Sequence, residues 1–242
     1  MSSPRKGRSL AKHRFLSAFD PTRLASRQAV AVIGLGRFGQ SLARELMADG
    51  AEVLGIDVSE DVVQSLNGQL THVVAADATN EEVLRQLGVT EFERVVIAIG
   101  SHLESSILIT SLLLRFGVPH IWAKAVSDAH GLILQQLGVP HVVYPEKDMG
   151  RRVAHIVLGS MEDFIEIDTD FAMVKTQVNP AYDGVRLGDS AIRQRHGVTV
   201  SAVKHRGAGW ETATADTVLR EGDVILVIGP SRKAERFTRA TP

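Results

Sequence analysis

The sequence of 242 residues contains no cysteine, and only 5% of its residues are aromatic. The lack of cysteine excludes disulfide bonds and thiol catalysis and is compatible with a reducing compartment. With so few aromatic residues, a platform for stacking the bases of single-stranded nucleic acid is not expected, and we predict no nucleic-acid partner. The longest apolar run, 107–114, is far shorter than the ~20 residues that span a bilayer. We therefore expect a soluble, cytoplasmic protein.

Positive charge is concentrated at the start of the chain. Residues 1–28 contain seven Lys and Arg residues and one acid, Asp20, whereas the rest of the chain has 20 basic and 27 acidic residues. A basic segment ahead of an acidic body suits an anionic surface such as phospholipid head groups. The simpler alternative is a disordered, solvating leader. No apolar stretch follows the charges, so a secretory signal is not indicated.

A glycine-rich loop, Gly34-Leu35-Gly36-Arg37-Phe38-Gly39, follows the first apolar strand. We expect Gly34 to allow a sharp turn, Gly36 to let a pyrophosphate approach the backbone, and Gly39 to let the next helix pack closely on the strand. The N-terminus of that helix then presents free N–H groups to an anion. Arg37 adds a cation that suits a phosphate-rich ligand such as ATP or ADP. The loop therefore predicts an adenine-nucleotide site.

Polar residues follow the ends of the later strands. Asp57 comes roughly 20 residues after the loop, where an acid holds the hydroxyls of a ribose. Asp77 is expected to orient the adenine side of the nucleotide; the alternative is that it caps the helix beginning at Asn80, and both roles can hold together. Lys124 places a cation at the same edge of the sheet, unless it is an ordinary solvated lysine. The residues predicted to bind the nucleotide are Gly34, Gly36, Arg37, Phe38, Gly39, Asp57, Val58, Asp77, Ala78, Thr79, Ile99, Gly100 and Lys124.

Strands and helices alternate up to residue 145. The expected strands are 29–33, 52–56, 72–76, 94–99, 120–125 and 141–144, and the expected helices are 37–49, 59–67, 80–87, 102–116 and 127–137. Continuously apolar strands are covered by helices on both faces, so the pattern predicts an α/β fold with a Rossmann-like, doubly wound parallel sheet. A further helix runs to about Gly159. Its apolar face, with Met149 and Val153, needs a second domain or a second subunit to cover it.

The last part of the chain predicts a small α+β domain. It has alternating strands at 164–168, 172–178, 199–204 and 223–228, a helix at 187–196 ended by Gly197, a turn at 206–209, and a closing helix at 231–239 capped by Ser231. We divide the chain into a basic leader at 1–28, a Rossmann-like domain at 29–145, a helix and linker at 146–162, and the α+β domain at 163–242.

Catalytic motifs are missing from the sequence. No two of the nine histidines stand at metal-ligand spacing, and Ser101, Ser105 and Ser106 lack a G-x-S-x-G frame. The small C-terminal domain offers no acid–base residue for dehydrogenase chemistry. We therefore expect a nucleotide sensor and not an enzyme. An NAD-dependent oxidoreductase is the alternative, because Asp57 would also permit NAD(H).

The motifs together resemble the RCK (also called KTN) regulatory subunits of Ktr/Trk potassium uptake systems, over about residues 29–240. The resemblance is carried by the glycine loop, Asp57, the stretches 76–79 and 121–125, and the sequence Pro-Glu-Lys-Asp-Met-Gly at 145–150. The loop and 145–150 in combination are similar to the KtrA-like branch. The resemblance implies an RCK-N domain, a crossover helix and an RCK-C domain.

The resemblance also implies a function. Such proteins dimerise through the crossover helix, and the dimers form an octameric ring. The ring docks on a membrane potassium-translocating subunit of the KtrB/TrkH type, at the inner face of the cell membrane. ATP and ADP compete for the Rossmann cleft, and the ring changes shape between them. The chain would then be a cytoplasmic, peripherally bound gating subunit.

Several residue roles follow from the resemblance alone. By position, Asp57 would bind ribose and Arg37 would meet the terminal phosphates. Glu146 would help to hold a divalent cation, Mg²⁺ or Ca²⁺, at the dimer interface. Some RCK-C domains of this kind bind cyclic di-AMP between two subunits. The matching positions here are Ile192, Arg193 and His196.

Overall fold

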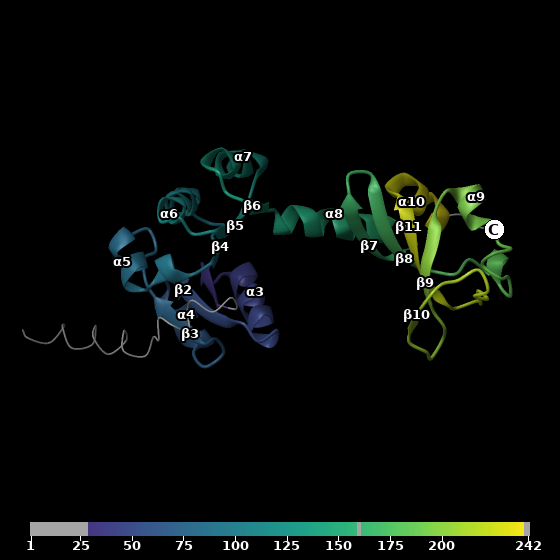
Figure 1. Ribbon diagram of the computed structural model, residues 1–242, viewed down its shortest axis with the longest axis horizontal. Helices are drawn as coiled ribbons and strands as arrows, with labels where there is room; N and C mark the ends of the chain where they lie inside the picture. Colours follow the sequence, from purple (N-terminus) through teal and green to yellow (C-terminus); the bar gives the residue numbers. More distant parts are fainter. Residues whose placement is uncertain (1–28, 159–160, 240–242) are drawn as a thin grey trace, which may run out of the picture. The chain divides into compact units, whose positions relative to one another are not determined.

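The computed structural model describes residues 29–158 and 161–239. The chain forms two compact units, of which the first ends at Pro145 and the second begins at Glu146 (Figure 1). The predicted leader at 1–28 and two residues of the predicted linker, 159 and 160, lie outside the described residues. No helix in the described ranges is long and apolar enough to cross a membrane.

The first unit is a parallel α/β structure. Its elements are β1 (Ala29–Ile33), α3 (Arg37–Ala48), β2 (Glu52–Asp57), α4 (Glu60–Leu66), β3 (His72–Ala75), α5 (Glu81–Gln86), the 3₁₀ turn η1 (Val89–Glu91), β4 (Arg94–Ile97), α6 (Leu103–Arg115), β5 (His120–Lys124), α7 (Asp128–Leu137) and β6 (His141–Val143). Each predicted strand and helix of this unit is present within one or two residues at either end.

The six strands form one sheet in the order β3-β2-β1-β4-β5-β6, and every pair is parallel. Successive residues of β1 point to opposite faces. Ala31 and Ile33 join a core formed with α5, α6 and α7, whereas Val30 and Val32 join a second core with α3 and α4. The predicted doubly wound, Rossmann-like sheet is therefore confirmed. Its strand order reverses between β1 and β4, which is where ligands bind in such sheets.

The second unit is a small α+β structure. Its elements are α8 (Pro145–Leu158), β7 (Met161–Asp168), β8 (Phe171–Gln177), the 3₁₀ turn η2 (Pro180–Tyr182), α9 (Ile192–His196), β9 (Thr199–Lys204), β10 (Trp210–Thr212), β11 (Val224–Pro230) and α10 (Ser231–Arg239). The strands form an antiparallel sheet in the order β10-β9-β11-β8-β7. Helix α8 is tied to this sheet by a bidentate ion pair between Arg152 and Asp163.

Three details of the second unit differ from the sequence prediction. Helix α9 begins at Ile192 and not at 187, because the N–H groups of Leu187 and Gly188 donate to the carbonyls of residues 217 and 215 across a loop. Strand β10 was not predicted. Ser231 does not cap α10: it is the first helical residue, and its buried hydroxyl has no hydrogen-bond partner in the described structure.

Candidate functional site

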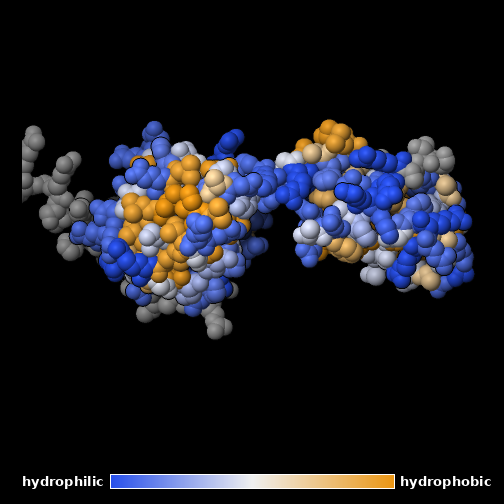
Figure 2. Space-filling model, turned by 90° about the horizontal axis from the view of Figure 1, so that it is seen from above, coloured by the Kyte–Doolittle hydropathy of each residue, from blue (hydrophilic) through white to orange (hydrophobic). Residues whose placement is uncertain are grey.

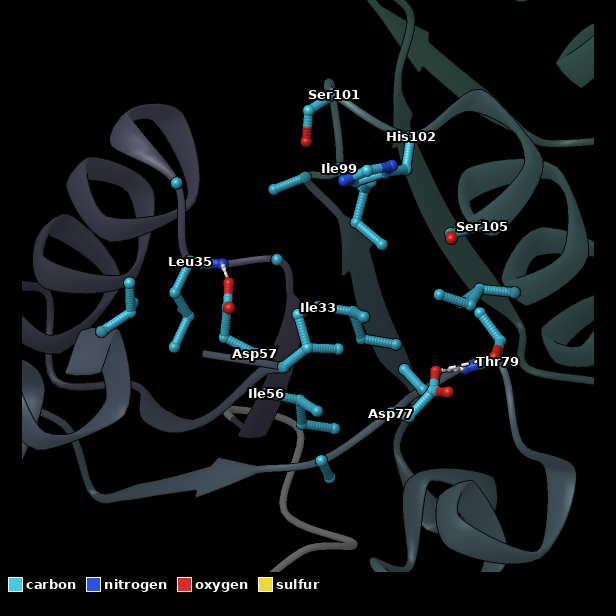
Figure 3. Close-up of a pocket in the computed structure, with 18 of the residues that line it drawn as sticks. Ile33, Leu35, Ile56, Asp57, Asp77, Thr79, Ile99, Ser101, His102 and Ser105 are labelled. Carbon is cyan, nitrogen blue, oxygen red and sulfur yellow. Dashed lines mark hydrogen bonds between the residues drawn. The ribbon is translucent and has the colours of Figure 1, made fainter. Parts of the chain in front are cut away.

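A cavity of about 330 Å³ opens at the carboxyl ends of the first four strands, where the strand order reverses (Figure 3). Its lining residues are Ile33, Gly34, Leu35, Gly36, Ile56, Asp57, Val58, Val62, Ala76, Asp77, Ala78, Thr79, Ala98, Ile99, Gly100, Ser101, His102, Ser105 and Ile109. The floor is apolar, and the polar groups are carboxylates, hydroxyls, backbone amides and the imidazole of His102. Such a lining suits a ligand that combines a flat apolar part with hydroxyl and phosphate groups.

The glycine loop forms one wall of the cavity. Gly34 has a φ of +92°, which favours glycine and turns the chain sharply off β1. A Cβ on Gly39 would lie 1.9 Å from the carbonyl oxygen of Gly34, so only glycine allows this packing. A Cβ on Gly36 would have no neighbour within 4 Å. Gly36 therefore leaves open space at the cavity wall, which is what a phosphate approaching the backbone requires.

Asp57 fixes the shape of the loop. One carboxylate oxygen accepts a hydrogen bond from the N–H of Leu35 at 2.6 Å (Figure 3), and the other accepts from the N–H of Ser59 at 2.9 Å. Hydrogen bonds to an ionised group are stronger than neutral ones. This role in joining the loop to the end of β2 was not predicted from the sequence. It keeps the carboxylate at the cavity wall, where the ribose role was predicted.

Asp77 lies across the cavity and forms a local turn with Thr79. The same carboxylate oxygen accepts from the N–H of Thr79 at 2.9 Å and from its hydroxyl at 2.7 Å (Figure 3). These two hydrogen bonds lower the pKa of Asp77 and keep it ionised. The residue that caps α5 is Asn80, whose side chain accepts from the N–H of Glu82. The alternative in which Asp77 caps this helix is therefore wrong.

The wall opposite the glycine loop contains residues that were not predicted. Ser101 and His102 are exposed in the turn after β4, and Ser105 lies in the first turn of α6. They come from the loop between a strand and a helix at the carboxyl edge of the sheet, and that position could have identified them. No hydrogen bond joins His102 to either serine in the described structure. The wall therefore lacks the nucleophile–base pair of a hydrolase.

Four predicted binding residues do not line the cavity: Arg37, Phe38, Gly39 and Lys124. Arg37 begins α3, is exposed, and makes no hydrogen bond or ion pair with a described residue. Lys124 is only 8% exposed, and its Nζ lies 5.6 Å from the centre of the Phe38 ring, within the range of a cation–π interaction. The alternative of an ordinary solvated lysine is therefore wrong.

The residues predicted in the second unit lie in three different settings. Glu146 is exposed in the first turn of α8. Ile192 is only 2% exposed and belongs to the core. The guanidinium of Arg193 donates to the hydroxyl of Thr199, and the ring of His196 is hydrogen-bonded to the hydroxyl of Tyr182. Across the described ranges, no group of three or more His, Asp or Glu side chains could hold a metal ion.

Comparison with known proteins identifies the class of protein. The family model for the TrkA-N domain matches residues 30–145, and the model for the TrkA-C domain matches residues 171–241. These matches define a chain with a Rossmann-like TrkA-N domain followed by a TrkA-C domain. Ktr system potassium uptake protein C of Bacillus subtilis is 36% identical over 214 residues, which cover 88% of this chain and 97% of the relative. The chain belongs to the family of Ktr potassium uptake proteins, as its motifs indicated.

One further relative agrees with this assignment, and two solved structures share the fold. Ktr system potassium uptake protein A of Vibrio alginolyticus is 35% identical over 204 residues, or 84% of this chain and 93% of the relative. The crystal structure of the GsuK RCK domain superposes with a TM-score of 0.62 at 21% identity and covers 90% of this chain and 49% of that chain. The GsuK channel bound to NAD gives a TM-score of 0.63 at 20% identity, covering 90% and 40%. The structural likeness shows the RCK fold.

Proposed function

We propose that this chain is the cytoplasmic gating subunit of a potassium uptake system and that it senses adenine nucleotides in the cavity of its first unit. The observation that carries the proposal is the cavity itself. It joins an open glycine loop to two strand-end carboxylates and has no nucleophile–base pair. In this proposal, nucleotide binding changes the conformation of the protein, and no covalent bond of the nucleotide is made or broken in the cavity.

The cavity suggests how a nucleotide would lie. The ribose hydroxyls would donate to Asp57, whose carboxylate is held at the wall by Leu35 and Ser59. The phosphates would run over Gly36 toward the first N–H groups of α3, where no side-chain cap is present. The base would extend toward Asp77 and Thr79 on β3's side of the cavity. The same frame accepts NAD(H), and the GsuK channel has been seen bound to NAD.

Discrimination between ATP and ADP requires a group that only the longer ligand reaches. We assign this role to Arg37, because it is exposed, lacks a partner among the described residues, and follows Gly36 at the start of α3. A ligand shifts a conformational equilibrium only by the difference in its affinity for the two shapes. A contact made by the terminal phosphate of ATP alone supplies such a difference.

Exposed apolar surface supports assembly with further copies of the chain. Figure 2 shows an apolar area on the first unit, on the side of α6 and α7. The exposed large apolar residues of these helices are Leu103, Leu108, Leu132, Ile133 and Leu137. Helix α8 has no buried residue, and its Met149, Val153 and Val157 are exposed. We propose that second copies cover both surfaces, with α8 as the crossover helix of a dimer and the dimers forming a ring.

The membrane partner, the domain limits and two further ligands belong to the same proposal. The ring would dock on a potassium-translocating membrane subunit, with residues 29–145 as the sensing domain, 146–162 as the connection and 163–242 as the second domain. Cyclic di-AMP could bind at Ile192, Arg193 and His196 between two subunits only if Ile192, a core residue in this chain, became accessible at that interface. Because residues 29–158 and 161–239 contain no cluster of three cation ligands, a divalent ion at Glu146 needs further ligands from the nucleotide or a second chain.

Calorimetric titration of the full chain with ATP, ADP and NADH tests the proposed function. We expect saturable binding of ATP and ADP and its loss in Gly36→Val, because that side chain would fill the open space at the cavity wall. Gly209→Val serves as the control, since a Cβ there also meets no heavy atom within 4 Å and its φ is not left-handed, but it lies directly before β10 in the second unit. Turnover of a nicotinamide substrate, or unchanged binding in Gly36→Val, would contradict the proposal.

A further inference from the structure

The second unit contains a cationic hollow between α9 and α10, with a volume of about 260 Å³. It is lined by Gln194, Arg195, His196, Gly197, Lys233 and Arg236. The wall therefore combines two arginines, a lysine and a histidine and contains no carboxylate. We call it the α9–α10 hollow. It is separate from the nucleotide cavity, which lies in the first unit, and it shares only His196 with the positions considered for cyclic di-AMP.

The cations of the α9–α10 hollow are not neutralised within the described chain. The side chains of Arg195 and Lys233 make no hydrogen bond or ion pair with any described residue, and the side chain of Arg236 donates only to the backbone carbonyl of Arg232 at 3.2 Å. The nearby acid Glu235 does not line the hollow and pairs with His155 at 3.0 Å. Like charges around one hollow repel each other, so an anion placed there would lower the electrostatic energy of the unit.

The first turn of α10, beside the hollow, lacks the acidic residues that helices favour at their N-termini. It contains no acid but has Arg232 and Lys233. Cations near a helix N-terminus oppose the helix dipole and are unfavourable there. Local rules are broken most often at functional sites, where something else compensates. An anion beside Lys233 would neutralise its charge and interact favourably with the positive end of the helix dipole.

On the α9 side of the hollow, His196 is held by its neighbours, and Gly197 leaves room for the side chain of Lys233. The ring of His196 is hydrogen-bonded to the hydroxyl of Tyr182 at 2.9 Å and meets the ring of Phe237 edge-on at 5.1 Å. Gly197 has a φ of +68°, and a Cβ there would lie 2.8 Å from the Nζ of Lys233. A side chain at this position would therefore displace Lys233 from the hollow.

We propose that the α9–α10 hollow binds a phosphate-bearing anion of about the size of a diphosphate. Arginine matches phosphate oxygens through paired N–H groups, and lysine adds a compact charge. The volume is below the roughly 300–1,000 Å³ of pockets that enclose a drug-sized ligand, so the hollow holds the charged group and leaves any organic part outside. The anion is either a soluble diphosphate ester or a phosphorylated lipid head group.

Titration of the full chain with sodium pyrophosphate tests this proposal. The variant Arg195→Gln/Lys233→Gln removes two cations from the hollow. The matched control Arg206→Gln/Arg232→Gln removes one arginine outside α10 and one cation in its first turn, but neither lines the hollow. Pyrophosphate bound in the first unit contributes equally to both, since neither variant changes that cavity. We expect the hollow variant to raise the Kd at least tenfold and the control to change it less than twofold.

Vesicles of phosphatidylcholine doped with phosphatidic acid, with pure phosphatidylcholine as the blank, identify the source of the phosphate. Binding to the doped vesicles that is lost only in the hollow variant assigns a lipid head group. Hollow-dependent binding of pyrophosphate without vesicle binding assigns a soluble ester. The proposal is overturned if the hollow variant and the control behave alike with both probes. Because the site lies in the second unit, that result would leave the nucleotide proposal for the first unit standing.

Discussion

At the scale of single residues, the glycines of the loop separate into two physical classes. Gly39 is required by packing, because a Cβ would lie 1.9 Å from the carbonyl oxygen of Gly34. Gly36 is not required by packing, since a Cβ there meets no heavy atom within 4 Å and its φ of −67° is open to any residue. Packing therefore requires Gly39, whereas it does not require Gly36, which we propose keeps the cavity wall open for a ligand.

This difference gives a prediction for two alanine variants. Gly39→Ala should lower the free energy of unfolding of the first unit by about 3 kcal/mol, because backbone atoms must move apart. Gly36→Ala should change it by less than about 1 kcal/mol and should weaken nucleotide binding. Urea unfolding and calorimetry measure the two effects. Equal stability of both variants would contradict the packing role of Gly39.

Arg37 carries a second prediction at this scale. Arg37→Gln should lower the affinity for ATP about tenfold or more and the affinity for ADP much less. The reason is that a charge-assisted hydrogen bond to the terminal phosphate contributes roughly 1.5–3 kcal/mol. Arg44→Gln is the control, since Arg44 is exposed on the same helix and donates to Gln69. Competition binding measures both. A similar loss for ATP and ADP would remove Arg37 as the discriminating residue.

At the scale of elements, α7 packs a histidine into the core of the first unit. His130 is 1% exposed, its Nδ1 accepts from the N–H of Val126 at 3.4 Å, and its buried Nε2 has no partner in the described structure. Burial lowers the pKa of His130 below its ordinary value of 6.5. The helix is therefore most stable when this imidazole is neutral.

The buried histidine predicts how stability depends on pH. Below pH 6.5 the unfolded chain takes up the proton more readily than the folded one, so stability falls as the pH is lowered. The loss is at most about 1.4 kcal/mol per pH unit for one proton. Urea unfolding at pH 7.5 and lower should show a weaker pH dependence in His130→Gln than in the exposed-site control His120→Gln. The same dependence in both variants would contradict a buried neutral His130.

Elements also show what the sequence could and could not predict. Apolar strands such as 29–33 and the glycine loop are local signals, so the doubly wound sheet was predicted. Asp57 and Asp77, predicted to bind nucleotide, both lie at the cavity wall. Contacts between distant residues were not. The N–H groups at 187 and 188 donate to the carbonyls of a loop about 30 residues further along the chain, and α9 is therefore shorter than predicted. Burial of Lys124 under Phe38 likewise depends on packing that spacing does not show.

At the scale of the whole molecule, the chain combines a ligand cavity with apolar surfaces that one copy leaves uncovered. The cavity is confined to the first unit, whereas the exposed apolar residues lie on α6, α7 and α8. Helix α6 belongs to both features, because its first turn contributes Ser105 to the cavity and its Leu108 is exposed. A ligand that moves the start of α6 would therefore act on the surface proposed for assembly.

Small-angle X-ray scattering of the full chain saturated with ATP and with ADP tests the central claim most directly. We expect two distinct distance distributions, because the two nucleotides are proposed to stabilise different shapes of the assembly. In Gly36→Val both distributions should coincide with that of the nucleotide-free protein. Identical curves for ATP and ADP, at concentrations where calorimetry shows both bound, would contradict nucleotide sensing by this cavity.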